Sequence, residues 1–234
     1  MMASCSCSNS IDVKIVSFNM HGFYQGFTVA EDLINREFPD VIALQEQWLT
    51  PDNLSKIEQH FNWFSYSAMT KCLETGMLRG RPFGGVVTLI KKYRSCTQSI
   101  HCDERFVVIR FANYLIVNVY LPCSGTKERA SICSSVLADI TSRTKIIVAG
   151  DINVDLDGCD NMVSQVNSFA ERCCLRRCDK IFPSSKRFTY VNEALDKHSY
   201  VDYMLTSCPD DVMEFDVLDP DVNYSDHLPL FAII

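Results

Sequence analysis

Short apolar runs, most of them ended by a polar or turn-forming residue, recur along nearly the whole chain. Runs of this length between turn residues predict β-strands, because helices need longer periodic stretches. The predicted strands are Val13–Phe18, Val41–Leu44, Val86–Ile90, Arg105–Phe111, Tyr114–Tyr120, Ile146–Val148, Phe188–Val191, Tyr200–Leu205, Met213–Leu218 and Leu230–Ile234. So many short strands limit the fold to one built around β-sheets.

Helices are predicted between some of these strands. They are Thr28–Arg36 with a capping box at Thr28 and Glu31, a short helix opening at Thr50-Pro51, Thr126–Thr141 and Val163–Cys173. Near-continuous apolar strands occur beside a hairpin signal at Ala112-Asn113. The pattern predicts an α/β fold with two mixed β-sheets packed face to face and helices outside. We expect one domain over residues 13–234, preceded by a short N-terminal tail, residues 1–12.

The composition excludes several classes of protein. Hydrophobic residues make up 47% and charged residues 22%, as in globular proteins. No apolar run approaches the roughly 18 residues that a membrane span needs, and Met1–Ser10 is not a secretory signal. We therefore expect no membrane contact and no secretion. The chain stops directly after an apolar strand, which suggests a domain cut from a longer polyprotein.

The 12 cysteines are expected to be reduced thiols. Cys5 with Cys7, and the run from Cys173 to Cys178, lack a second pair at zinc spacing. The net charge of -7 argues against a protein that coats nucleic acid non-specifically, but it permits an enzyme with a local basic rim. The candidate rim residues are Arg79, Arg81, Lys91, Lys92, Lys186 and Arg187.

Polar side chains lie at the ends of the predicted strands, in one order along nearly the whole chain. They are Asn19, Glu46, Tyr120, Asp151, Asn153, Asp202, Asp226 and His227. Any one of them alone is explained as a turn former or a surface charge. Together they predict a site at one mouth of the sandwich, because strand ends hold side chains rigidly.

Six short segments carry a resemblance to a known group of enzymes. They are Ser17-Phe18-Asn19, Leu44-Gln45-Glu46, Asn118-Val119-Tyr120, Gly150-Asp151-Ile152-Asn153, Tyr200-Val201-Asp202-Tyr203 and Ser225-Asp226-His227. In this order they resemble the signatures of the endonuclease/exonuclease/phosphatase superfamily, over Val13 to Ile234. The resemblance implies a four-layered α/β sandwich and hydrolysis of phosphoesters with a divalent metal.

Within the superfamily the chain is most similar to the apurinic/apyrimidinic-like endonuclease domains of non-LTR (LINE-type) retrotransposons. The segments Ser17 to Gly22, Pro82 to Val87 and Ser199 to Leu205 carry this likeness. Two sequence differences separate this chain from other members of the superfamily. Val154-Asp155 follows Asn153, unlike phosphoinositide phosphatases, and His21 stands where repair enzymes usually have an acidic residue.

The resemblance also implies roles for individual residues. Glu46, with Asn19 beside it and Asp226 nearby, would hold Mg²⁺, for which Mn²⁺ could substitute; hard oxygen ligands suit both ions. Asp151 would orient or deprotonate the attacking water, and Asn153 would hold that water or a phosphate oxygen. His227, oriented by Asp202, would act on the phosphate as donor or base, and Tyr120 would hydrogen-bond the phosphate.

Substrate contacts are expected around the loop Asn192–Ser199, where a hairpin of the retrotransposon enzymes probes the DNA groove. The candidates to line that groove are Lys186, Arg187, Tyr190, Lys197 and His198. Thr189 and Ser199 resemble family positions near the phosphate-binding rim. His21, His60, His101 and His198 match no motif and are expected to be structural or on the surface.

Three functions remain open at this point. The first is an Mg²⁺-dependent endonuclease that nicks one strand of double-stranded DNA and so primes reverse transcription. A reverse transcriptase domain would then follow in the same polypeptide, and the isolated domain would be a monomer acting in the nucleus after cytoplasmic synthesis. The second is a phosphoesterase acting on inositol phosphates or RNA 3′ ends, which the acidic charge favours. The third, an inactive binding module, is disfavoured by uncompensated carboxylates converging in one cleft.

Overall fold

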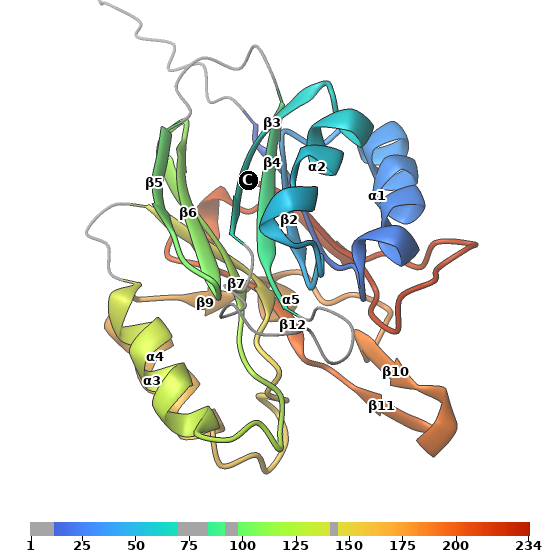
Figure 1. Ribbon diagram of the computed structural model, residues 1–234. Coiled ribbons are helices and arrows are strands. Elements are labelled where there is room, and N and C mark those ends of the chain that lie inside the picture. The colour runs from blue at the N-terminus through green and yellow to red at the C-terminus, as the bar shows by residue number, and fades with distance from the viewer. Residues whose placement is uncertain (1–11, 70–83, 92–97, 141–144) are drawn as a thin grey trace, which may run out of the picture.

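The computed structural model describes residues 12–69, 84–91, 98–140 and 145–234. Two six-stranded mixed sheets pack face to face, with helices on both outer sides (Figure 1). This confirms the four-layered α/β sandwich expected from the sequence. Most of the tail, the rim candidates Arg79, Arg81 and Lys92, and the pair Cys5 and Cys7 lie outside the described residues.

The first sheet has the strand order β13-β14-β1-β2-β4-β3. Its strands are β1 (Lys14–Asn19), β2 (Val41–Gln45), β3 (Phe64–Met69), β4 (Val86–Lys91), β13 (Glu214–Val217) and β14 (Leu230–Ile233). Only β1 and β2 run parallel, and β14 pairs with β1 antiparallel. The loop that leads into β14 therefore lies at the same end of the sheet as the last residues of β1 and β2.

The second sheet has the order β5-β6-β7-β8-β12-β9. Its strands are β5 (Gln98–Cys102), β6 (Phe106–Phe111), β7 (Tyr114–Tyr120), β8 (Ile146–Asp151), β9 (Arg176–Arg177) and β12 (Asp202–Thr206). The pairing of β7 with β8 is parallel, and that of β8 with β12 is antiparallel. The register sets Tyr120 and Asp202 on either side of Asp151 at one end of the sheet.

The helices form the two outer layers. They are α1 (Phe23–Glu37), α2 (Ser55–His60), α3 (Arg129–Asp139), α4 (Val163–Arg172) and α5 (Cys178–Ile181), with short 3₁₀ turns at Pro51–Asn53, Glu193–Leu195 and Pro209–Asp211. Alternate side chains of β1 face opposite layers: Ile15 packs between the sheets, and Val16 packs with the α1 residue Leu33. None of the helices in the described ranges has the length and hydropathy of a membrane span.

Separate from both sheets, β10 (Tyr190–Asn192) and β11 (Lys197–Ser199) form a hairpin that projects from the sandwich (Figure 1). It contains the segment Asn192–Ser199, which was predicted as a loop, and residues 197–199 of that segment form a strand instead. Its base is tied to the core, because Tyr190 forms a β-bridge with His227 and Val191 N–H donates to the Asp226 carbonyl at 2.8 Å.

Several predicted elements differ from the structure. The helix α1 begins at Phe23 rather than Thr28, so the capping box of Thr28 and Glu31 is wrong. Its start is set by Gly22, whose φ of 102° few other residues adopt, and by burial of Phe23 against the sheet. The strands β3 and β5 were not predicted. Both are edge strands with polar residues in their sequences, and edges need no continuous apolar run.

A close approach of β7 and β8 fixes the position of Asp151. Gly150 has a φ of +148°, and a Cβ there would lie 1.9 Å from the Val119 carbonyl oxygen. We expect Gly150→Ala to lower the free energy of unfolding by about 3 kcal/mol, because the clash is with backbone. Thermal denaturation followed by circular dichroism measures this.

Gly125→Ala is the matched control for that variant. Gly125 also has a positive φ, +97°, but a Cβ there would meet nothing within 4 Å. It should cost only the backbone strain, about 1 kcal/mol. Equal losses in the two variants would contradict the role given to the close approach.

Candidate active site

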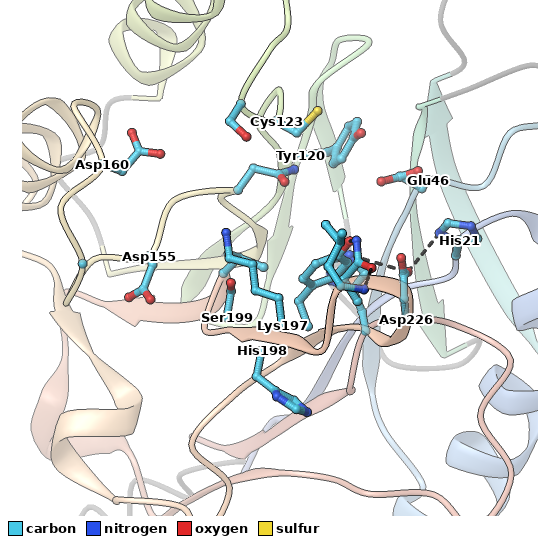
Figure 2. A pocket seen from close by; sticks show the side chains of 18 of the residues that line it. His21, Glu46, Tyr120, Cys123, Asp155, Asp160, Lys197, His198, Ser199 and Asp226 are labelled. Carbon is cyan, nitrogen blue, oxygen red and sulfur yellow. Dashed lines mark hydrogen bonds and ion pairs between the residues drawn. The ribbon is translucent and has the colours of Figure 1, made fainter.

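A cavity of about 790 Å³ opens at the strand ends described above (Figure 2). Side chains from the loops after β1, β2, β7 and β8 line it, together with the hairpin and the segment before β14. Of the predicted site residues, Glu46, Tyr120, Asn153, Tyr190, Ser199, Asp226 and His227 line the cavity. Asn19, Asp151 and Asp202 lie just beneath them and are hydrogen-bonded to lining residues.

His227 and Asp202 form a buried pair. Nδ1 of His227 lies 2.8 Å from Oδ2 of Asp202. This contact fixes the orientation of the ring and leaves Nε2 free of Asp202. Nε2 lies 4.0 Å from Asp151 and 3.9 Å from Asp226. Burial by itself would lower the pKa of His227, but the charges of Asp202, Asp151 and Asp226 outweigh it and raise the pKa to about 10. These charges favour the cationic form of the imidazole, in which Nε2 is a hydrogen-bond donor.

Asp151 is fully buried and held from three directions. Its Oδ2 accepts from the side-chain amides of Asn19 at 3.0 Å and Asn153 at 2.9 Å, and its Oδ1 accepts from the Asn153 backbone at 2.8 Å. Burial and the charge of Asp202 raise the pKa of Asp151 well above its usual range, partly offset by His227. Such a crowded carboxyl in a cleft is typical of a catalytic centre.

Glu46 presents its carboxylate to the cavity. Oε1 accepts from Nδ2 of Asn19 at 3.1 Å, and Oε2 accepts from Nε1 of Trp48 at 2.9 Å. A hard divalent cation binds carboxylate oxygens, and a half-buried carboxylate that lines the cavity near buried Asp151 suits such an ion. Asn19 is fully buried and its amide oxygen accepts from His21 N–H at 3.0 Å, whereas Glu46 lines the cavity, so Glu46 offers the accessible ligand atoms.

A second group of side chains also has the composition of a metal site. Asp151, Asp202 and His227 offer ligand atoms within 4.8 Å of one another. All three are buried, and the direct bond between Asp202 and His227 already uses one atom of each. We therefore favour Glu46 as the principal ligand.

Tyr120 lines the cavity at the end of β7, where it is the register partner of Asp151. Burial, followed by the charges of Glu46 and Asp151, raises the pKa of Tyr120. The phenol therefore keeps its proton and can donate it in a hydrogen bond at the cavity wall.

His21 was expected to be structural or on the surface, and the structure places it in the cavity wall instead. Its Nδ1 lies 2.9 Å from Oδ1 of Asp226, as the dashed line in Figure 2 shows. Although burial raises the pKa of Asp226, the hydrogen bond from His21 and the charge of His227 bring it below its usual range. The signal in the sequence was its place two residues after Asn19, at the end of the same strand.

The expected substrate residues divide into two groups. Tyr190 and Ser199 line the cavity, as do Lys197 and His198 of the hairpin. Thr189 does not reach the expected phosphate-binding rim: it is fully buried, and its hydroxyl accepts from the backbone of Val201 and Asp202. Arg187 and Lys186 border a neighbouring cavity, and Lys186 pairs with Asp219.

The remaining expectations concern residues away from the cavity. His60 contacts Phe27 and His101 stacks on Phe106. Lys91 is exposed at the end of β4. The eight cysteines in the described ranges are all free, Cys173, Cys174 and Cys178 among them.

Four residues of the cavity wall have a left-handed backbone conformation. His21, Glu46, Trp48 and Asn153 all have φ values between 49° and 55°, and all four line the cavity. This left-handed conformation costs a non-glycine residue about 1 kcal/mol or more and persists only where its surroundings enforce it. Arg129 supplies part of that support, because its guanidinium donates to the Asn153 carbonyl at 2.7 Å and pairs with Asp160.

A four-layered sandwich with a buried His–Asp pair and clustered carboxylates at one mouth defines a metal-dependent phosphoester hydrolase. The chain belongs to the Endonuclease/Exonuclease/phosphatase family, whose sequence profile matches residues 16–227. Members of this family are metal-dependent nucleases and phosphodiesterases that act on ester bonds. The family assignment expected from the six short motifs is thereby confirmed.

Individual relatives agree with this assignment. The chain is 30% identical over 161 residues to a DNA-(apurinic or apyrimidinic site) endonuclease of Dictyostelium discoideum; the match covers 61% of this chain and 42% of that protein. Two solved structures share the fold. A Neisseria 3′ phosphatase bound to a product DNA hairpin has a TM-score of 0.73 at 15% identity, covering 94% of this chain and 98% of the other. An Archaeoglobus fulgidus AP endonuclease has a TM-score of 0.72 with the same identity and coverage.

Proposed function

We propose that this protein is a Mg²⁺-dependent endonuclease that nicks one strand of double-stranded DNA. The observation that carries the proposal is the convergence of Glu46, Asp151 and His227, from distant parts of the sequence, on one cavity. Two relatives, an abasic-site endonuclease and a 3′ phosphatase bound to a DNA hairpin, support DNA as the substrate.

We further propose that the nick primes reverse transcription of a non-LTR retrotransposon. Its support is the likeness of the segments around Asn19 and Asp202 to those endonucleases. A reverse transcriptase domain would then belong to the same natural polypeptide. The protein would be made in the cytoplasm and act in the nucleus, and the isolated domain would be a monomer.

The side chains can divide the chemistry among them. Asp202 holds Nδ1 of His227, which leaves the cationic ring free to donate from Nε2 to a phosphate oxygen. Asp151, 4.0 Å from that nitrogen, would orient or deprotonate the attacking water, and Asn153 would hold the water or a phosphate oxygen. A divalent cation held by Glu46, with Asp226 nearby, would offset the phosphate charge and stabilise the leaving oxygen.

Supercoiled plasmid tests the proposal. We expect relaxation in the presence of Mg²⁺, with Mn²⁺ able to substitute, and no relaxation after addition of EDTA. A duplex carrying one abasic site should be run beside an intact duplex, because the relative's function makes that lesion a candidate substrate. A protein that leaves both substrates intact over a range of Mg²⁺ concentrations would refute the proposal.

A second candidate is a phosphoesterase acting on inositol phosphates or RNA 3′ ends. One observation favours it: among the described residues, carboxylates outnumber Lys and Arg side chains in the cavity wall, where Asp155 and Asp160 join Glu46 and Asp226. A chain of phosphates is repelled by such a wall more than a small ester is. Release of inorganic phosphate from a small ester, without plasmid relaxation, would favour this candidate.

Lys197 is expected to contribute to DNA binding. Within the part of the chain that the structure describes, it is the only Lys or Arg lining the cavity (Figure 2). Lys197→Ala should weaken DNA binding and reduce the slope of log affinity against log salt by about 1. We expect Arg187→Ala on the neighbouring cavity to reduce the slope as well.

The control for both variants is Lys91→Ala, since Lys91 is exposed at the end of β4 and borders neither cavity. Fluorescence anisotropy with a labelled duplex at several salt concentrations gives the slopes. The same slope for Lys197→Ala as for Lys91→Ala would remove Lys197 from the DNA-binding surface.

A further inference from the structure

We propose that Trp48 is a positioning residue, which fixes the Glu46 carboxylate in the orientation that binds a divalent cation. The inference rests on the proposed function, because it concerns the metal site that the reaction needs. It gives a role to an aromatic residue that lies two positions after Glu46 and lines the same cavity.

The contact that carries the proposal is direct. The indole Nε1–H of Trp48 donates to Oε2 of Glu46 at 2.9 Å, while Asn19 donates to Oε1 at 3.1 Å. Each carboxylate oxygen has about two acceptor positions, so these two donors and a hydrogen bond from Tyr120 leave at least one position for a cation. With both oxygens anchored, the carboxylate loses its rotational freedom before the cation arrives, and binding costs less entropy.

Neighbouring residues restrict the position of the Trp48 indole. A Cβ on Gly22 would lie 2.5 Å from Cε3 of Trp48, so only glycine leaves room for the ring. The His21 ring packs edge-on at 4.8 Å, and the Trp48 backbone N–H donates to the Gly84 carbonyl at 3.1 Å. Residues of the loop after β1 thus hold Trp48 in place, and Trp48 in turn orients the Glu46 carboxylate.

The simpler alternative is that Trp48 only fills space in the wall. Space filling does not explain why the backbone of Trp48 adopts a strained φ of 52° beside Glu46 at 53°. Trp48→Phe separates the two accounts, because phenylalanine keeps an aromatic ring in the wall and removes the indole N–H that donates to Glu46. The chain offers a matched control, since its other tryptophan, Trp63, is 74% exposed and far from Glu46 in the fold, after α2.

The first measurement is Mg²⁺ binding by isothermal titration calorimetry, without DNA. We expect Trp48→Phe to weaken Mg²⁺ affinity by about 10-fold, as loss of a group that orients a metal ligand does, and Trp63→Phe to leave it unchanged. Plasmid nicking should then need a correspondingly higher Mg²⁺ concentration for half-maximal rate, and regain most of its rate at saturating Mg²⁺. Unchanged Mg²⁺ affinity in Trp48→Phe would overturn the inference.

A second measurement uses protein with Trp48 intact, so it does not depend on the folding of that variant. Terbium luminescence excited through tryptophan should persist in Trp63→Phe and be displaced by Mg²⁺, because Trp48 would lie beside the bound ion. Luminescence lost in Trp63→Phe would overturn the inference. A fall in Mg²⁺ affinity in Trp48→Phe supports the inference even in a protein that nicks no DNA, an outcome that would remove the proposed function alone.

Discussion

Asp202→Asn is expected to lower kcat by about a thousandfold or more and to leave the fold intact. Asp202 is buried, and its carboxylate both fixes Nδ1 of His227 and raises the pKa of that ring. Asparagine has the same shape but no charge, so the pKa of His227 falls and the ring is less often a cation at neutral pH. Replacing the aspartate of a catalytic His–Asp pair by asparagine has an effect of this size in serine proteases.

Single-turnover nicking at saturating Mg²⁺ measures this loss, and circular dichroism checks the fold. Asp139→Asn, on the exposed side of α3, is the control and should keep full activity. A variant Asp202→Asn with nearly normal kcat would show that His227 works without its partner. A large fall in melting temperature would instead assign Asp202 a structural role.

Glu46→Gln is expected to lower the nicking rate by about a thousandfold at physiological Mg²⁺, because the amide removes the charge of the principal metal ligand. The glutamine amide has one acceptor oxygen, so it keeps one of the two hydrogen bonds from Asn19 and Trp48 and loses the other. Glu46 also adds to the negative charge around Asp151, and relief of that repulsion opposes the loss, so the melting temperature should change little.

The nicking rate of Glu46→Gln should be followed over a wide range of Mg²⁺ concentration. The control is Glu58→Gln on α2, an exposed residue outside the cavity. Equal Mg²⁺ requirements for the Glu46→Gln variant and the wild type would exclude Glu46 as a ligand. They would point instead to the group formed by Asp151, Asp202 and His227.

The convergence of the site could be predicted because backbone pairing fixes it. Tyr120 and Asp202 are register partners of Asp151, and Asn19 ends the strand beside the one that leads to Glu46. Side chains at the ends of paired strands lie next to one another because of the strand register, and this does not depend on loop conformation. The order of polar residues along the sequence was therefore enough to predict which ones gather.

Contacts that depend on loops could not be predicted in the same way. His21 meets Asp226, and Trp48 meets Glu46, only because the left-handed backbone at His21, Glu46 and Trp48 turns these side chains into the cavity. Thr189 looked like a rim hydroxyl, but its neighbours in space are backbone amides that need an acceptor.

In the proposed reaction, residues from both sheets share a single cation and a single phosphate. A crystal structure with Mn²⁺ and a nicked duplex tests this directly, because Mn²⁺ gives an anomalous peak. We expect that peak at the Glu46 carboxylate, with a phosphate of the duplex between it and Nε2 of His227. A peak enclosed by Asp151, Asp202 and His227, or a duplex whose phosphates do not enter the cavity, would contradict the account.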